Sequence, residues 1–519
     1  MPLLQCYVSS YKVLIYNPKF GISHLTFSGK IADTLAAAGH EVVVYQPILN
    51  EKITFTGSKH KSIRYYTMPK NYTMAPEFSM DSAVKIVWEL DSMAHLKKMM
   101  AEMSIIRAEF CEQVMNDEEN LAKLKAENFD LGISESFESC GFGVFKKLGI
   151  KKHITTFASA LFPKMSILLG IKVNPSYIPG MLSKSTDEMT FSQRITNFGY
   201  YLLENWWMGS WSTKGIQEVV QRQFPDFNLE DSISDSAFFY INSDEHIDYP
   251  QPITHKVVFI AGLGKVQARP LEKEYLDIFD SAKKGVILLS FGSNVQSSQM
   301  KPEMKEAFLE AFSEFPDINF LWKYEKDEDQ IAKGYKNVFT GKWLPQNDIL
   351  DHPKLLAFIS HGGMNSVMEG STKGIPMICI PLAADQSHNS MILVRRGTAI
   401  KLEKNEITKE SIIASIKEII GNEKYQKNAK LLSKMVAAKP TKAEERVVKY
   451  AEFAAQFGDT GTLQTQGRHQ SIWVLYSIDV IVFLVIVIGV IVAIFVFIVK
   501  KVLNFLKRKL SNISTKKLN

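Results

Sequence analysis

The chain of 519 residues has few cysteines and no short internal repeat. Its four cysteines are Cys6, Cys111, Cys140 and Cys379, and their spacing is irregular. This pattern is typical of neither a disulfide framework nor a zinc site. It favours single buried thiols for Cys140 and Cys379. The sequence also contains no low-complexity linker.

The body of the chain also lacks net charge, although the whole chain carries +6. Seven of the 61 Lys and Arg residues lie in residues 500–519, which contain no acidic residue. The remaining 54 basic and 55 acidic residues nearly cancel, so nucleic acid is not expected as a partner. A hydrophobic content of 46% and a charged content of 22% are globular values, and the length predicts two domains with additional segments.

The N-terminal pattern predicts a short leader followed by an α/β domain. Residues 1–10 form a weak or truncated signal segment, because they have no charged side chain and their apolar run is shorter than the usual ~7–15 residues. Predicted strands at Lys12–Asn17 and Glu41–Gln46 flank a predicted helix at Phe27–Ala38, which is the opening of a doubly wound domain. His24 lies in the loop after the first strand, at the edge where such sheets bind ligands.

The second half of the chain contains a glycine-rich turn between two apolar runs. Leu355–Ile359 and Pro376–Ile380 have the length of buried parallel strands. Between them, His361–Gly370 (HGGMNSVMEG) predicts a turn with two glycines and the start of a helix. The free N–H groups and partial positive charge of a helix start bind anions such as a diphosphate.

Polar and aromatic side chains around this turn suit a nucleotide sugar. Glu369 comes one turn after Ser366, where its carboxylate can accept hydrogen bonds from ribose hydroxyls, and Trp343 offers a flat face for a base. Asp385 and Gln386 follow the second strand, again at the carboxyl end. For the HGG motif alone, an ordinary βαβ unit with a glycine-rich turn is the alternative interpretation.

The motifs W-x-P-Q, L-x-H, H-x-G-x-N-S-x-x-E, G-x-P and D-Q occur in this order within Trp343–Gln386. Together they resemble the nucleotide-sugar signature of the UDP-glycosyltransferases, most of all the animal, membrane-anchored UDP-glucuronosyltransferase branch. The resemblance implies the GT-B architecture, an α/β fold in which two Rossmann-like doubly wound domains face a cleft. It implies a UDP-sugar co-substrate, no metal and no other cofactor. The donor-binding residues it implies are Ser293, Trp343, Gln346, His361, Gly363, Asn365, Ser366, Glu369, Asp385 and Gln386.

The same resemblance implies a catalytic pair in the first domain. The segment Gly21–His24 (GISH) matches a G-x-S-H motif whose histidine is the general base, and a neutral imidazole is suited to deprotonate an acceptor hydroxyl. A carboxylate should hold the other ring nitrogen. Aligning Phe129–Gly143 with the family places Glu135 where the family has aspartate. Glu138 is a possible substitute, and a further alternative is that both are surface acids.

The end of the chain predicts a membrane anchor. Val480–Val499 contains no charged residue and, as a helix, spans about 30 Å, the thickness of the hydrocarbon core. Lysines and arginines follow at once, which predicts a cytosolic tail and a lumenal catalytic body. The terminal KKLN resembles a dilysine retrieval signal of the endoplasmic reticulum. The predicted order is a leader at 1–10, an acceptor-binding domain at 11–262, a linker at 263–281, a donor-binding domain at 282–460, a juxtamembrane segment at 461–479, a transmembrane helix at 480–499 and a tail at 500–519.

Three further patterns leave alternatives open. Asp327 and Asp329 could hold a metal after a strand, although they lie in a charged loop. Tyr200–Trp211 is rich in aromatic residues and could line an acceptor pocket, rest on a bilayer or pack inside the domain. Asn71 begins an N-glycosylation sequon, usable only if the domain is lumenal.

These patterns together predict an inverting UDP-glycosyltransferase of the endoplasmic reticulum membrane. The expected activity is glucuronosyl transfer from UDP-sugar to a hydroxyl of a small lipophilic acceptor, as in detoxification. The alternatives are a UDP-glucosyltransferase of the same family and a non-catalytic membrane sugar-binding protein on the same scaffold. Membrane lipid is an expected partner, and the sequence leaves homo-oligomer formation open.

Overall fold

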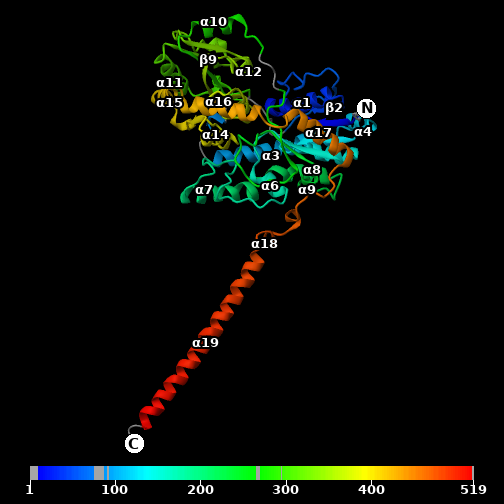
Figure 1. Cartoon of the computed structure of the whole chain (residues 1–519). Coiled ribbons are helices and arrows are strands. Elements are labelled where there is room, and N and C mark those ends of the chain that lie inside the picture. The colour runs from blue at the N-terminus through cyan, green and yellow to red at the C-terminus, as the bar shows by residue number, and fades with distance from the viewer. Residues whose placement is uncertain (1–9, 75–86, 90–92, 265–268, 294, 517–519) are drawn as a thin grey trace, which may run out of the picture.

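The computed structural model describes residues 10–74, 87–89, 93–264, 269–293 and 295–516. The predicted leader at residues 1–10 falls almost entirely outside these ranges. The described chain forms two α/β domains stacked on each other, with a long helix projecting from one end of the body (Figure 1).

The first domain contains a seven-stranded parallel sheet in the order β3-β2-β1-β4-β5-β6-β7. Its strands are β1 (Lys12–Tyr16), β2 (Glu41–Pro47), β3 (Arg64–Met68), β4 (Leu131–Glu135), β5 (His153–Phe157), β6 (Phe239–Ile241) and β7 (Val257–Phe259). Its helices are α1 (Ile22–Ala37), α3 (Met93–Met115), α4 (Glu118–Ala126), α5 (Cys140–Leu148), α6 (Pro163–Leu168), α7 (Phe191–Leu202), α8 (Gly209–Gln221) and α9 (Leu229–Ser234), with the π-helical turn η1 (Leu203–Met208) between α7 and α8. Apolar clusters cover both faces of the sheet, which explains why the central strands are almost continuously apolar.

The second domain repeats this topology with six parallel strands in the order β10-β9-β8-β11-β12-β13. Its strands are β8 (Gly285–Ser290), β9 (Ile318–Lys323), β10 (Val338–Gly341), β11 (Leu355–Ser360), β12 (Met377–Cys379) and β13 (Ala399–Lys401). Its helices are α10 (Lys273–Ser281), α11 (Pro302–Ser313), α12 (Gln346–Ile349), α13 (Met364–Lys373), α14 (Gln386–Arg395), α15 (Lys409–Gly421) and α16 (Glu423–Ala437). Both sheets have the strand order of a Rossmann fold, with β1 and β8 beside the switch points.

Two segments differ from the domain limits expected from sequence. The expected linker 263–281 contains α10, whose Phe279 is fully buried in the core of the second domain. Helix α17 (Ala443–Phe457), expected in the second domain, crosses back and packs against α1 and the first sheet. Its Val447 carbonyl accepts a hydrogen bond of 2.8 Å from Tyr240. The linker was predicted because residues 263–281 are mostly polar, and α17 was assigned to the second domain because it follows that domain in the sequence. In both cases the apolar face of the helix determines which domain it packs against.

Trp88 is a residue of the first half of the chain that packs in the second domain, whereas α17 comes from the second half and packs on the first domain. It precedes α3 in the first half of the chain, yet its indole is only 1% exposed within the core of the second domain. The ring packs edge-on against Phe291 at 5.2 Å and donates a hydrogen bond of 2.9 Å to the Gln296 carbonyl. The two domains are therefore interlocked by exchanged segments.

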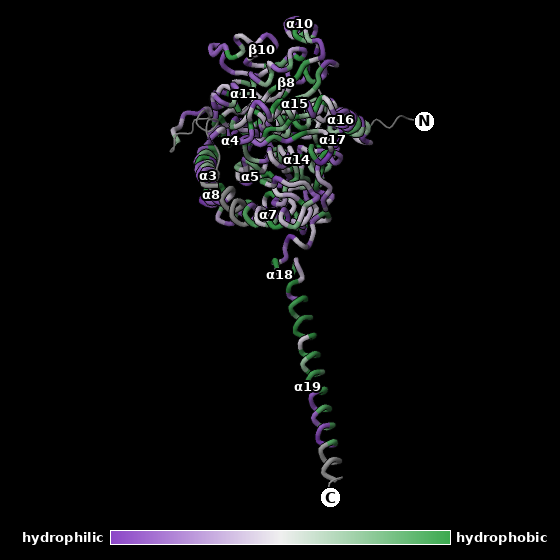
Figure 2. Tube along the Cα trace, turned by 90° about the vertical axis from the view of Figure 1, so that its left-hand side faces the viewer, coloured by the Kyte–Doolittle hydropathy of each residue, from purple (hydrophilic) through white to green (hydrophobic). Residues whose placement is uncertain are grey.

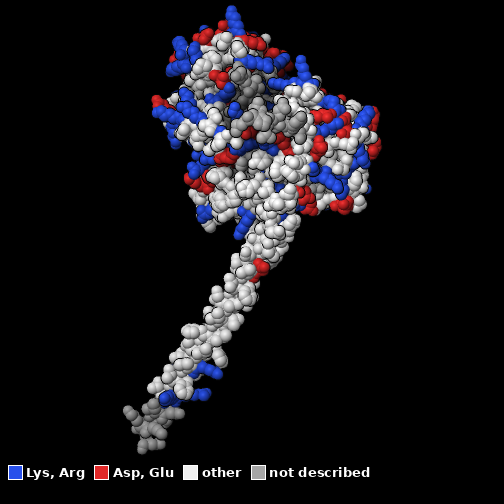
Figure 3. Space-filling view, turned by 45° about the vertical axis from the view of Figure 1, so that its right-hand side comes forward, with Lys and Arg blue, Asp and Glu red and all other residues white. Residues whose placement is uncertain are grey.

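The C-terminal helix stands apart from both domains. After the short helix α18 (Ile472–Leu475), α19 (Ile478–Lys516) extends away from the body, and its first half is strongly hydrophobic (Figure 2). Residues Ile478–Leu510 are long and apolar enough to cross a membrane, by length and composition. Lys and Arg side chains follow near its far end (Figure 3). The apolar stretch predicted at 480–499 lies within this helix.

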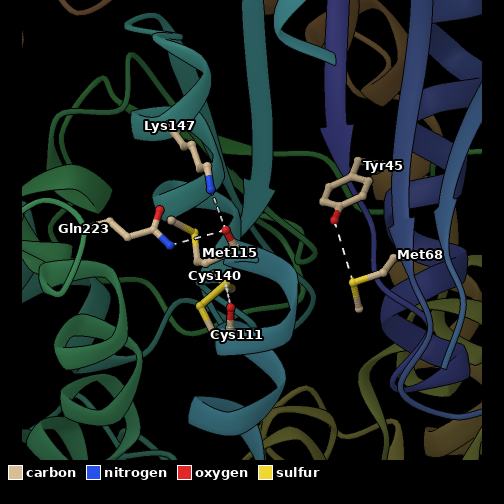
Figure 4. Close-up of a disulfide and its surroundings, with 7 residues drawn as sticks. All are labelled: Tyr45, Met68, Cys111, Met115, Cys140, Lys147 and Gln223. Atoms are coloured by element: carbon tan, nitrogen blue, oxygen red, sulfur yellow. Dashed lines mark hydrogen bonds between the residues drawn. A yellow bond between two sulfur atoms is a disulfide. The ribbon is translucent and has the colours of Figure 1, made fainter. Parts of the chain in front are cut away.

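Cys140 is not a single thiol, as the sequence suggested, but forms a disulfide with Cys111 (Figure 4). The bond joins α3 to the start of α5, and nearby Lys147 donates a hydrogen bond of 2.6 Å to the Met115 carbonyl. The two cysteines are 29 residues apart, and sequence spacing alone could not show that α3 and α5 pack side by side. Cys379 is a buried free thiol, as predicted.

Removing this disulfide should destabilise the first domain. We expect Cys111→Ala/Cys140→Ala to lower the free energy of unfolding by about 2–4 kcal/mol, because the open chain gains conformational freedom when unfolded. Denaturant unfolding with and without a thiol reductant measures this. The reductant should reproduce the loss in the unsubstituted protein and leave the double variant unchanged. If the unsubstituted protein and the double variant have the same free energy of unfolding without reductant, the disulfide does not stabilise the fold.

Candidate active site

The glycine-rich turn forms the floor of the site in the second domain. Strand β11 ends at Ser360, and α13 begins at Met364 with Gly363 at its N-cap. No side chain caps this helix, so the backbone N–H groups of its first turn point outward without a side-chain partner. Gly362 has φ of +78°, and a Cβ on Gly363 would overlap the ring of His361. Both glycines are thus required by the local geometry.

His361 is held beside this turn as a neutral side chain. Burial lowers its pKa to about 4, so at neutral pH the imidazole can donate a hydrogen bond but carries no charge. Gly292 lies against the same ring, because any Cβ at this position would be 2.7 Å from His361. Ser293, the next residue, therefore lies in the turn after β8, near His361. Strands β8 and β11 are paired, which places both turns at one edge of the sheet.

Gln346 and Glu369 meet on the other side of the turn. The Gln346 amide donates a hydrogen bond of 2.5 Å to the Glu369 carboxylate, and burial raises the pKa of Glu369. Trp343, three residues before Gln346, is 67% exposed, so its indole faces remain open for stacking. Asn365 and Ser366 lie in the first turn of α13, on the approach to Glu369.

A cavity of about 630 Å³ opens between the domains at this point. This volume lies within the ~300–1,000 Å³ typical of small-molecule sites. Residues of the second domain in its wall include Asn365 and Glu369, and α1 of the first domain contributes Lys30. Sequence patterns did not single out Lys30, because a lysine on an amphipathic helix has no distinguishing signal. Asn242, also in the wall, donates a hydrogen bond of 3.1 Å to Asn365, and its position directly after β6 was a signal that could have identified it.

Asp385 lies where the domains meet. Its carboxylate accepts a hydrogen bond from Ser159 of the first domain and another, of 2.9 Å, from Asn389. Ala384, just before it, has φ of +54°, a strained conformation for a residue with a Cβ that often marks a functional turn. Gln386 uses its side-chain oxygen to cap the turn, accepting from the Leu382 amide at 2.8 Å. Its side-chain amino group is not engaged by this contact.

A histidine–carboxylate pair faces this region from the first domain. His24 Nδ1 lies 2.8 Å from one oxygen of Glu135 and 2.9 Å from the other. Glu135 ends β4, and α1 begins at Ile22, so His24 lies in the first helical turn and not in a loop. The sequence prediction started the helix at Phe27 because Gly21, its N-cap residue, has no capping side chain. Since β1 and β4 are paired, their carboxyl ends bring the two side chains together.

The surroundings of His24 restrict its ring and tune its basicity. Phe20 and Phe137 lie against the imidazole at centroid distances of 4.7 Å and 4.9 Å. Burial lowers the pKa of His24, but the adjacent Glu135 carboxylate raises it more, with a smaller contribution from Asp385, so the net pKa is above its ordinary value. The Ala158 amide donates a hydrogen bond of 3.1 Å to Glu135 and holds the carboxylate in place.

Glu138 does not take the place of Glu135. Both glutamates are buried, at 2% and 5% exposure, which contradicts the alternative that they are surface acids. Glu138 interacts with Arg107 and Tyr16, and burial raises its pKa to about 7 although Arg107 lowers it. The contact with His24 therefore identifies Glu135 as the partner of the imidazole.

The aspartates suggested as a metal site are already engaged. Asp329 accepts a hydrogen bond of 2.6 Å from Tyr324, and Asp327 pairs with Lys342 at 3.3 Å. Among the residues that the structure describes, no three His, Cys, Asp or Glu side chains form a group able to hold a metal. The two main features of the site are the uncapped start of α13 and the His24–Glu135 pair.

Two solved structures have the same fold as this chain. The chain superposes on the glycosyltransferase of kitacinnamycin with a TM-score of 0.58 and 17% identity, covering 87% of this chain and 100% of that one. It superposes on LpCGTa in complex with UDP with a TM-score of 0.57 and 16% identity, covering 86% and 100%. The fold is thus that of the GT-B glycosyltransferases.

Sequence comparison gives the family. Residues 12–517 match the family model described as "UDP-glucoronosyl and UDP-glucosyl transferase". The chain belongs to this family. It is 30% identical to a putative UDP-glucuronosyltransferase, ugt-48, of Caenorhabditis elegans, over 92% of this chain and 93% of the relative. It is 28% identical to human UDP-glucuronosyltransferase 2B17 over 99% and 97%, and 27% identical to UDP-glucosyltransferase 2 of Dactylopius coccus over 92% and 90%.

The glycine turn makes a direct prediction about donor binding. Gly363→Ala should weaken UDP binding at least about tenfold, a loss of ~1.4 kcal/mol, because the new methyl group displaces the His361 ring. Calorimetric titration with UDP measures the dissociation constant. Gly421→Ala is the matched control, since a Cβ there meets no atom within 4 Å. If both variants bind UDP equally well, the turn does not hold the nucleotide.

Proposed function

We propose that this chain is an inverting UDP-glycosyltransferase that transfers a sugar to a hydroxyl group of a small lipophilic acceptor. The observation that carries the proposal is the His24–Glu135 pair, whose atoms lie 2.8 Å apart at the place where Asp385 of the second domain also acts on His24. His24 removes the proton of the acceptor hydroxyl as that oxygen attacks the anomeric carbon. Glu135 orients the ring and stabilises the imidazolium that forms. A single displacement of UDP inverts the configuration at that carbon.

The donor site follows from the second domain. Trp343 stacks on the uracil, and Gln346 and Glu369 hold the uracil edge and the ribose. His361, Gly363, Asn365 and Ser366, with Ser293 nearby, bind the diphosphate, and the charge that grows on UDP is stabilised by the start of α13. Asp385 and Gln386 hold the sugar hydroxyls. No step in this reaction requires a metal.

Glucuronate is the proposed sugar, and glucose is the second candidate. The relatives named UDP-glucuronosyltransferases, one from Caenorhabditis elegans and one from human, support a donor with a carboxylate. Asp385 lies at the proposed sugar position and repels a carboxylate, which favours a neutral hexose. Parallel assays with UDP-glucuronate and UDP-glucose, using a simple phenol as acceptor, decide between them. Binding of the UDP-sugar without any acceptor-dependent release of UDP would instead support a non-catalytic binding protein.

The proposed location is the endoplasmic reticulum membrane, with the body in the lumen and the tail in the cytosol. The Cys111–Cys140 disulfide supports this orientation, because such bonds persist in oxidising compartments. The lysines and arginines after the apolar part of α19 support a cytosolic tail. Asn71 is exposed and its sequon is accessible to lumenal glycosylation.

His24→Ala should abolish sugar transfer and leave UDP binding intact, because the histidine acts on the acceptor and lies outside the donor site. Turnover is measured as acceptor-dependent UDP release, and UDP affinity is measured on the same preparation. Transfer that persists in this variant would show that another group is the base.

Glu135→Gln should reduce kcat/KM by about 10²–10⁴-fold. It should also shift the pH profile. The base works only when neutral, so kcat/KM falls as pH drops below the pKa of His24. Glu135 raises that pKa, and its removal should move the acidic limb to lower pH.

Glu138→Gln provides the matched comparison for this experiment, since Glu138 is equally buried but does not contact the imidazole. Its kcat/KM should fall far less. If Glu138→Gln, and not Glu135→Gln, causes the large loss of kcat/KM and shifts the acidic limb of the pH profile, Glu135 is not the partner of His24.

A further inference from the structure

Helix α7 is amphipathic, but its apolar side is exposed and its polar side is directed into the protein. Phe191, Ile195 and Phe198 are spaced at i, i+4 and i+7, so they form one stripe along the helix. These side chains are 71%, 59% and 50% exposed. In a helix on the surface of a soluble domain, such a stripe normally faces the core.

The face of α7 that is directed into the protein is polar instead. Asn197 is the buried residue of this helix, and it is engaged with the backbone of the preceding loop. Its side-chain oxygen accepts a hydrogen bond of 3.0 Å from the Gly180 amide, and its amino group donates one of 2.9 Å to the Ile178 carbonyl. These bonds fix the rotation of the helix, so the apolar stripe cannot turn inward without breaking them. A contiguous exposed stripe of large apolar side chains marks an interaction surface.

The position of α7 identifies what covers the stripe. Figures 1 and 2, which are related by a 90° rotation, both place α7 at the end of the first domain from which α18 and α19 leave. The Tyr201 hydroxyl of α7 lies 3.1 Å from the Tyr476 hydroxyl, directly before α19. In α18, Ile472 and Trp473 are 50% and 61% exposed and continue the apolar surface toward α19. Only two residues separate α18 from α19, so the body cannot lie far from whatever α19 enters.

We propose that α7 lies on the bilayer surface, with Phe191, Ile195 and Phe198 inserted among the lipids beside α19. This inference rests on the proposed membrane anchoring by α19. Amphipathic helices of this kind bury their apolar face about 5–10 Å deep, at the boundary of headgroups and acyl chains. Arg194, whose guanidinium lies 5.7 Å from the centre of the Phe191 ring, is placed to reach lipid phosphates at the edge of the stripe. The first domain is thereby held in one orientation on the membrane.

Depth-dependent quenching tests this placement in the full chain. Cys6 is replaced by serine so that it cannot be labelled, and Cys379 is kept because it is buried. Each protein then carries one environment-sensitive fluorophore, on Ile195→Cys or on Phe198→Cys. It is reconstituted into phosphatidylcholine vesicles that contain lipids with a nitroxide near the headgroup or deep in the acyl chain. Labels on Ile491→Cys in α19 and on Asp277→Cys in α10, at the opposite end of the body in both views, are the controls. UDP binding by each labelled protein verifies its fold.

We expect labels at 195 and 198 to be quenched at least twofold more by the shallow nitroxide than by the deep one. The label at 491 should be quenched by the deep nitroxide and the label at 277 by neither. If 491 is quenched while both 195 and 198 behave like 277, the inference is overturned, and a second copy of the chain or a protein partner must cover the stripe. If 491 is also unquenched, the anchoring itself fails, and the inference fails with it.

Discussion

Parallel strands place all their carboxyl ends at one edge of a sheet, and this constraint brings the proposed catalytic groups into one cleft. His24 and Glu135 follow β1 and β4, which are neighbours in the first sheet. Ser293 and His361 follow β8 and β11, which are neighbours in the second. Hydrogen bonds from Ser159 to Asp385 and from Asn242 to Asn365 join these edges, so the His24–Glu135 pair and the glycine turn both lie at the junction of the two domains.

Burial makes the site sensitive to its pairings. Glu135 is 5% exposed, and a buried carboxylate is costly unless it is hydrogen-bonded. The His24 ring and the Ala158 amide both supply such bonds. Burial lowers the pKa of both histidines, but His24 also contacts the Glu135 carboxylate, which raises its pKa above the ordinary value. The two histidines thus obtain different pKa values from their neighbours.

Sequence patterns predicted the local features of this protein better than its long-range contacts. The glycine turn at His361–Gly370, both Rossmann-like halves and the pairing of His24 with a glutamate could be predicted, because each depends on a short motif or a strand end. The Cys111–Cys140 disulfide and the contact between Ser159 and Asp385 could not, since each joins segments that only the fold brings together. Helix α10 was not predicted because its many charged residues are typical of a linker. The one residue that anchors it in the core, Phe279, gives no clear pattern in the sequence.

The return of α17 to the first domain decides which half of the protein is joined directly to the C-terminal helix. The chain leaves the second domain before α17, packs α17 against α1, and only then continues into α18 and α19. The half of the protein that contains His24 therefore connects directly to α18 and α19. The second domain is linked to these helices through the first domain, which it also contacts through the segment that buries Trp88. Any displacement of α19 is thus transmitted first to the domain that contains His24 and then to the domain that contains the glycine turn.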